Sequence, residues 1–200
     1  MKNNLVYLNV GSQDRVYRGL TFAVFDRNMP IPEDGGNKAE IEVFQVEPKV
    51  SIARIVKSNI KNPIVPEDNV ANLIWDSKTS NRFVVLGDYD LNNDGKLDND
   101  GNRRVREMIE RWGGIVEKEV TINTDFVIVG QAPRVLPKPA QAQMELDSTL
   151  QQKYDESAEM TKSYDAQLAK ARVLCVPVFN QKRFFYLIGN ETILGANAGK

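Results

Sequence analysis

The chain has 200 residues, 42% of them apolar, which is enough for a core in one large domain or two small ones. Its net charge of −1 gives no overall attraction to nucleic acid or to an anionic membrane, and no apolar run is long enough to span a bilayer. With no histidine and a single cysteine, this chain excludes Ser-His-Asp and Cys-His catalysis, a His-ligated zinc site and an internal disulfide. The apolar setting of that cysteine, VLCVPV, predicts that Cys175 is a small buried core residue.

Residues 5–74 have the pattern of short strands separated by turns. The first, LVYLNVG, alternates so that Val6, Leu8 and Val10 share one face. A loop with two prolines and a Gly-Gly pair is expected at 27–38. The later strands are LTFAVFD, AEIEVFQV, VSIARIV and VANLIWD. Five or six short strands predict a small closed or nearly closed antiparallel β-barrel over residues 1–76.

A small polar stretch at 76–82 has the composition of a linker, and the pattern changes after it. Strands now alternate with helices, in the order β-α-β-β-α-β-α, which predicts a mainly parallel sheet with helices on both faces over residues 82–200. The segments are RFVVLGD, NRRVREMIERWGG, IVEKEVT, TDFVIVG, a long polar helix at 148–172, VLCVPV and KRFFYLIG. Trp75 and Trp112 are expected in hydrophobic cores.

Five of these segments resemble, in order, the elements of a BRCT domain. RFVVLGD is similar to its first strand with a glycine turn at Gly87, and VREMIERWGG to its first helix with the closing pair Gly113 and Gly114. IVEKEVTINTDFVIVG is similar to its second and third strands, LAKARVLCVPV to the end of its second helix and its fourth strand, and RFFYLIG to its ending in bacterial NAD-dependent DNA ligases. The resemblance implies a four-stranded parallel sheet with flanking helices, a large insertion at about 134–160, and a non-catalytic binding module.

The chain departs from the BRCT pattern where that family binds phosphate. Phosphopeptide-binding members have Ser or Thr before the glycine of the first strand and a Lys near the second helix. Here Leu86 precedes Gly87, and Ser163 stands near the place of that Lys, next to Lys162. Phosphate needs convergent donors and positive charge. Phosphopeptide binding is therefore not expected.

The first half has a vaguer resemblance. VYLNVGSQDRVYRGLTFAVF is similar to the small C-terminal β-barrel of the bacterial flagellar assembly protein T. That resemblance implies a non-catalytic module of a kind often found in envelope-associated proteins. We expect the chain to be a piece of a longer bacterial protein, in the cytoplasm or the envelope according to the sequence before it.

Residues 88–100, DYDLNNDGKLDND, hold five aspartates in a loop. Their spacing matches most of a calcium loop. A bidentate carboxylate is missing at the last ligand position, where Gly101 stands one residue after Asp100. Two interpretations stay open: a Ca²⁺ site and a solvated acidic loop. The Ca²⁺ ligands would be Asp90, Asn92, Asp94, Lys96 through its carbonyl, Asp98 and Asp100.

Four basic residues, Arg103, Arg104, Lys182 and Arg183, could contact an anionic partner such as DNA phosphates. The neighbouring aspartates and glutamates offer them ion pairs instead. The 148–172 helix has a weak apolar stripe that either packs within the chain or pairs with a second copy. The sequence thus predicts a non-catalytic protein-interaction or scaffold module, with a DNA-associated module and a calcium-stabilised structural domain as alternatives.

Overall fold

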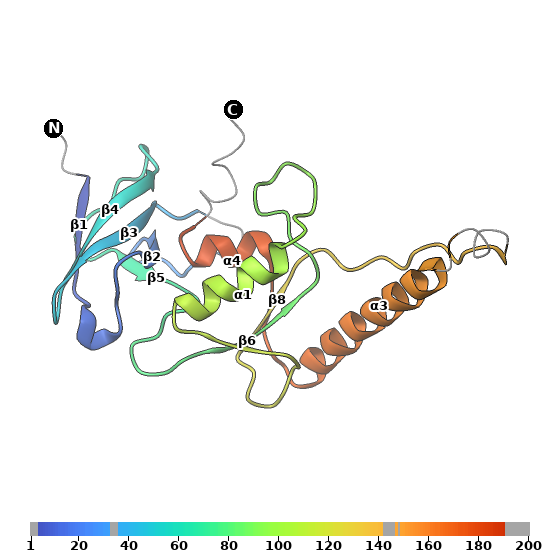
Figure 1. The fold of residues 1–200 in the computed structure, drawn as a ribbon. Helices are drawn as coiled ribbons and strands as arrows, with labels where there is room; N and C mark the ends of the chain where they lie inside the picture. Colours follow the sequence, from blue (N-terminus) through green and yellow to red (C-terminus); the bar gives the residue numbers. More distant parts are fainter. Residues whose placement is uncertain (1–3, 33–35, 142–146, 148, 191–200) are drawn as a thin grey trace.

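The computed structural model describes residues 4–32, 36–141, 147 and 149–190, which form two separate sheets and three α-helices (Figure 1). Short strands make up the first sheet, which is antiparallel throughout in the order β1-β4-β3-β2-β5. A 3₁₀ turn at Ser12–Asp14 follows the first strand. The strands are β1 Leu5–Leu8, β2 Thr21–Phe25, β3 Ala39–Val46, β4 Ser51–Ser58 and β5 Asn69–Ala71.

The first sheet curls as a half-barrel. Two register shifts between β3 and β4, at Glu40/Ile41 and at Val43/Gln45, supply local bends of the kind that bulges produce. In the described part of the chain, β1 and β5 are the two ends of the strand order. The expected antiparallel sheet is therefore confirmed, while the closed barrel is present only as this open, curled sheet.

Strand β5 is shorter than VANLIWD predicts, and Asn72 gives the reason. Its side-chain oxygen accepts hydrogen bonds from the backbone N–H groups of Ile74 (2.8 Å) and Trp75 (3.1 Å), and its amide nitrogen donates to the Thr21 carbonyl at 2.7 Å. An asparagine that binds the backbone two and three residues ahead turns the chain. The strand ends at Ala71, one residue before this turn.

The second sheet is parallel, in the order β7-β6-β8-β9. Together with its helices it follows the β-α-β-β-α-β-α order expected from the sequence. Its strands are β6 Arg82–Leu86, β7 Ile115–Glu117, β8 Phe126–Val129 and β9 Val178–Asn180, and the helices are α1 Gly101–Arg111, α3 Thr149–Val173 and α4 Gln181–Leu187.

The expectation of a buried Cys175 in a strand is wrong. Helix α3 continues to Val173, and the chain then turns through Cys175, which has a left-handed backbone (φ 55°) and is exposed. The Val176 N–H donates to the Ala171 carbonyl at 2.9 Å and closes the end of the helix. In the apolar run VLCVPV, Val173 ends the helix, Leu174 and Cys175 form a turn, and only Val178 belongs to the strand that pairs with β8.

The two sheets share one core. Helices α1 and α4 lie between them (Figure 1), and one buried cluster includes Phe22 and Ile41 of the first sheet together with Phe83, Ile109 and Phe184 of the second half. The residues of the two sheets lie on either side of the 76–82 stretch. Their apolar faces nevertheless meet through α1 and α4, so burial of each face depends on both halves.

Helix α3 projects from the body of the molecule (Figure 1). With 25 residues it is about 37 Å long, and of its described side chains only Ala171 is fully buried. The extended segment 132–140 lies beside it. Two hydrogen bonds join them, from the Leu136 N–H to the Ser157 hydroxyl at 3.0 Å and from the Thr161 hydroxyl to the Pro133 carbonyl at 3.3 Å. Part of the expected 134–160 insertion, 142–146 and 148, falls outside the described residues.

Candidate functional site

The candidate site lies where β6 ends, at the carboxyl edge of the parallel sheet, the edge where open α/β sheets bind ligands. Gly87 turns the chain there with a left-handed backbone (φ 76°). A Cβ on Gly87 would lie 2.5 Å from the Gln131 carbonyl oxygen, so a side chain cannot fit. The next residue, Asp88, pairs with Gln131 across this turn, with hydrogen bonds of 2.9 and 2.7 Å. Only glycine satisfies both constraints at position 87.

A chain of hydrogen bonds from α1 fixes the floor of the site. The Asn102 amide donates to the Gly87 carbonyl at 2.7 Å, and the Arg106 Nε donates to the Asn102 side-chain oxygen at 2.7 Å. A second Arg106 nitrogen, Nη2, donates to the Val85 carbonyl at 2.8 Å. The Arg106 guanidinium therefore holds the end of β6 directly and the Gly87 turn through Asn102. Part of its hydrogen-bond donor capacity is already used in these contacts.

Beside this floor runs a groove of about 510 Å³ between the β6 turn, the start of α1 and the middle of α3. Met160, which is 63% exposed, and Tyr164 contribute apolar surface from α3. Burial raises the pKa of the Tyr164 hydroxyl. Further lining residues are Val85, Leu86, Gly87, Asp88, Asn102, Arg106, Pro133, Glu156, Glu159 and Ser163.

The groove is acidic. Asp88, Glu156 and Glu159 supply three carboxylates, whereas Arg106 supplies one guanidinium. That guanidinium already donates to Asn102 and to the backbone. A phosphate would meet a net negative charge here, and a cationic side chain would meet favourable potential.

The acidic loop stands next to the groove and is anchored by buried residues at its base. Tyr89 is fully buried, and its hydroxyl donates to the Ile128 carbonyl at 2.9 Å. Burial raises the pKa of this phenol far above its usual range. Leu91 is also buried, and its N–H donates to the Asp98 carboxylate at 2.7 Å. The side-chain amide of Gln181 in α4 exchanges hydrogen bonds with the backbone of Asp90.

The carboxylates at the tip of the loop bind the loop's own backbone. The Asp90 carboxylate accepts from the N–H groups of Asp94 (3.2 Å) and Gly95 (2.8 Å), and the Asp94 carboxylate accepts from the Lys96 N–H (2.8 Å) and the Asn92 amide (3.0 Å). Asp94 N–H also donates to Asn92 at 3.1 Å. Within the described residues, no group of three or more carboxylate or cysteine side chains is placed to hold a metal ion. The two interpretations of the loop, a Ca²⁺ site and a solvated acidic loop, both stay predictions.

The four basic residues singled out from the sequence have different surroundings. Arg103 pairs with Asp100 at 2.8 Å and with Glu107 at 2.5 Å. Arg183 lies over the Phe179 ring, with the guanidinium carbon 5.2 Å from the ring centroid. Arg104 borders a smaller cavity beside Met108 and Phe185, and Lys182 is exposed on α4. Contact with an anionic partner through these residues stays a prediction.

Sequence reasoning located part of the groove and missed the rest. Leu86, Gly87 and Ser163, compared above with the phosphate pocket of BRCT domains, do line one groove. Glu156, Glu159 and Met160 were not singled out. Their signal is the three- and four-residue spacing that places 156, 159, 160 and 163 on one side of a helix.

No family model matches the chain, and no curated protein matches it. Among solved structures, the chain is similar to the crystal structure of a hypothetical protein, with 10% sequence identity and a TM-score of 0.20. The match covers 90% of this chain and 58% of that chain, so this chain spans little more than half the length of that structure. A likeness at this level carries no argument about fold or function.

Proposed function

We propose that this chain is a non-catalytic protein-interaction module whose second half is BRCT-like, and that its groove binds a peptide segment with basic and apolar side chains. The observation that carries the proposal is the groove itself. It lies where the BRCT resemblance puts the phosphate pocket, at Leu86, Gly87 and Ser163. Its three carboxylates would repel phosphate and attract lysine or arginine.

The lining also suits the apolar part of such a peptide. Met160 adapts to different partners because its side chain is flexible and polarisable. Tyr164 and Pro133 offer rigid surface on either side of it. A groove of about 510 Å³ takes a few side chains, so we expect affinities in the micromolar range, as is usual for short peptides.

Fluorescence polarisation tests the proposal with three labelled hexapeptides: one that alternates Arg and Leu, one with Glu in place of Arg, and one with phosphoserine in place of Arg. We expect only the Arg peptide to bind. Glu156→Lys and Glu159→Lys should each weaken it about tenfold or more, since each converts attraction into repulsion.

Asp165→Lys is the matched control, because it makes the same charge change on the same helix at an exposed residue outside the groove lining. It should leave affinity nearly unchanged. Equal loss in all three variants would show that binding follows overall charge and does not use the groove. Preference for the phosphoserine peptide would refute the proposal directly.

A further inference from the structure

A short segment of opposite charge to the groove lies on the same projecting part of the molecule. Residues 134–138, RVLPK, run beside α3 and carry two basic side chains, Arg134 and Lys138, with an apolar pair between them. All five residues are exposed, and Val135 and Leu136 each keep 47% of their surface open. We call 134–138 the basic segment. It combines basic and apolar side chains, as does the peptide proposed above for the groove.

The basic segment is held in place although it belongs to neither a helix nor a sheet. Pro133, Pro137 and Pro139 each fix one backbone dihedral, and the residue before each proline is confined to extended conformations. The Leu136 N–H donates to the Ser157 hydroxyl at 3.0 Å, which fastens the middle of the segment to α3. A segment that is ordered before it binds loses little conformational entropy in the complex.

The charges of the basic segment and of the groove do not pair with each other in one copy. Within the described residues, Arg134 and Lys138 form no ion pair and no side-chain hydrogen bond. The carboxylates of Asp88 and Glu159 also have no such partner in that part of the chain. Glu156 accepts from a neutral amide of its own helix at 2.8 Å. Each copy therefore offers both members of a set of opposite charges, which two copies can satisfy mutually.

Helix α3 and the basic segment, which we call the arm, also leave apolar surface uncovered. The arm projects from the body of the molecule (Figure 1), and Ala171 is the one fully buried side chain among those described in α3. Met160 is 63% exposed and lies one turn from Ser157, to which the basic segment is fastened. Most of the stability of a helix in a protein comes from packing of its apolar side, so a helix of this length gains from a partner.

We propose that the partner of the groove is a second copy of this chain, whose basic segment enters the groove with its two cations against the three groove carboxylates. The inference rests on the proposed function, because it takes the groove as a site for a basic and apolar peptide and adds which peptide that is. The contact is reciprocal, since each copy supplies one segment and one groove, and two copies then close into a symmetric pair. The contact surface is small, so we expect a weak dimer with a Kd on the order of 10 µM at low salt.

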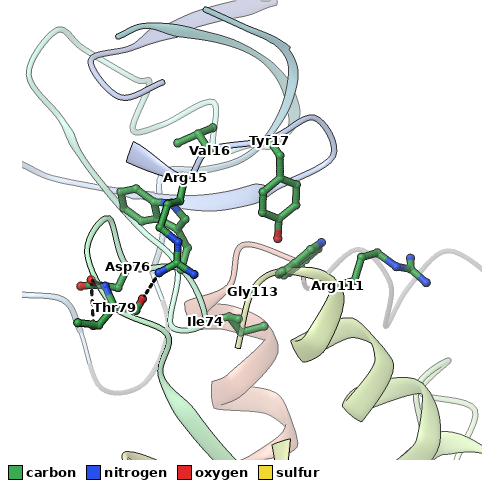
Figure 2. Close-up of a pocket in the computed structure, with 10 residues that line it drawn as sticks. Arg15, Val16, Tyr17, Ile74, Asp76, Thr79, Arg111 and Gly113 are labelled. Atoms are coloured by element: carbon green, nitrogen blue, oxygen red, sulfur yellow. Dashed lines mark hydrogen bonds between the residues drawn. The ribbon is translucent and has the colours of Figure 1, made fainter. Parts of the chain in front are cut away.

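The joint between the two halves of the chain argues against another way of pairing, in which two copies exchange whole halves. Figure 2 shows Arg15 of the first half reaching Thr79 in the stretch that joins the two sheets, beside a cavity of about 340 Å³. The Arg15 guanidinium also donates to the Ser80 hydroxyl at 2.7 Å. An exchange of halves would break these bonds and divide the shared core. Pairing through the arm leaves both intact.

Sedimentation velocity of the full chain, at concentrations from about 1 to about 300 µM, tests the proposal. In about 50 mM salt we expect a concentration-dependent change from monomer to dimer. In about 500 mM salt the dimer should be weakened about tenfold or more, because salt screens ion pairs at an exposed contact.

Two charge-reversed double variants locate the contact. Arg134→Glu/Lys138→Glu and Glu156→Lys/Glu159→Lys should each stay monomeric, because like charges then meet in the groove. An equal mixture of the two should form a one-to-one complex, because each segment now meets a groove of opposite charge on the other variant. Association of the mixture also shows that both variants are folded.

Lys49→Glu/Lys61→Glu is the matched control, because it makes the same charge change at exposed residues of the first half, away from the arm. It should dimerise as the unmodified chain does. A dimer that both charge-reversed variants still form alone would overturn the inference, since the copies would then meet through another surface.

The monomeric variant Arg134→Glu/Lys138→Glu separates this inference from the proposed function, because its groove is unmodified. Fluorescence polarisation with the Arg-Leu hexapeptide measures that groove alone, and we expect the peptide to bind. If the variant binds the peptide while the unmodified chain stays monomeric at about 300 µM, the second copy is wrong and the proposed function stands. If the variant does not bind the peptide, the proposed function itself is wrong.

Discussion

Replacing Gly189 by alanine should destabilise the fold at the contact between α4 and the first sheet. Gly189 follows α4 with a left-handed backbone (φ 65°). A Cβ at this position would lie 2.2 Å from the Phe22 carbonyl carbon and 2.4 Å from the Ala23 backbone nitrogen. The contact is with the backbone of β2, which cannot move aside as a side-chain tip can.

Two physical terms add in this variant. The left-handed backbone penalises alanine by about 1–2 kcal/mol, and forcing a methyl group into a filled space adds about 1–3 kcal/mol. We expect a total loss of about 2–5 kcal/mol, which lowers the melting temperature on the order of 10 °C for a chain of this size. Thermal and urea denaturation, followed by circular dichroism and by tryptophan fluorescence, measures it. Because the two sheets share one core, both probes should report one transition.

Gly19→Ala isolates the first term. Gly19 also has a left-handed backbone (φ 91°), but nothing lies within 4 Å of a Cβ built there. It should lose only the strain of about 1–2 kcal/mol. If the two variants lose the same stability, the direct approach of α4 to β2 is wrong. If the helical and tryptophan signals of Gly189→Ala unfold separately, the shared core is wrong.

Three further predictions concern the contact between β2 and the end of α4, the stretch that joins the two sheets, and the acidic loop. Thr21→Val should destabilise the fold by about 1–2 kcal/mol in denaturant titrations, because the buried Thr21 hydroxyl donates to the Ile188 carbonyl at 2.6 Å. Hydrogen bonds from the backbone of Thr79 and Lys78 hold the pKa of Asp76 below its usual value, so the stabilisation is present above pH about 4 and is lost as pH falls through the folded-state pKa. In Asp76→Asn the free energy of unfolding should therefore depend less on pH in that acid range. The same pH dependence in the variant and in the unmodified chain would contradict this. Millimolar calcium should leave the melting temperature unchanged. The reason is that Gly101, the first residue of α1, stands where a calcium loop has its bidentate carboxylate. A rise of the melting temperature with calcium would show a bound ion and contradict this prediction.

The order of elements could be predicted because most of them repeat apolar residues at helical or strand spacing. The 148–172 helix lies at Thr149–Val173, and the three- and four-residue spacing of Val105, Ile109 and Trp112 gives α1 its buried side. Both sheets and their parallel or antiparallel character follow from the same periodicities. No helix in the described ranges is long and apolar enough to cross a bilayer, as the absence of a long apolar run indicates.

What could not be predicted depends on contacts between segments far apart in the chain. The acidity of the groove arises because the projecting α3 brings Glu156 and Glu159 beside Asp88, and local sequence does not encode that approach. Trp112 lies in the shared core and Trp75 packs against it, as expected, but local sequence does not indicate that both also line one cavity between distant segments. The prediction of a buried Cys175 in a strand was wrong because a short apolar run occurs both in strands and at helix ends.

The position of α4 has a consequence for synthesis. All five residues of β2 are buried, and Phe25 meets Tyr186 of α4 with ring centroids 5.6 Å apart. About 160 residues separate these partners, so at cellular translation speeds a nascent chain carries β2 without its cover for on the order of 10 to 30 s. During that time one apolar face of the first sheet lacks its cover, and exposed apolar surface of this kind makes an incomplete chain prone to aggregation. The cover of the first sheet is therefore complete only after α4, the last described helix, has been synthesised.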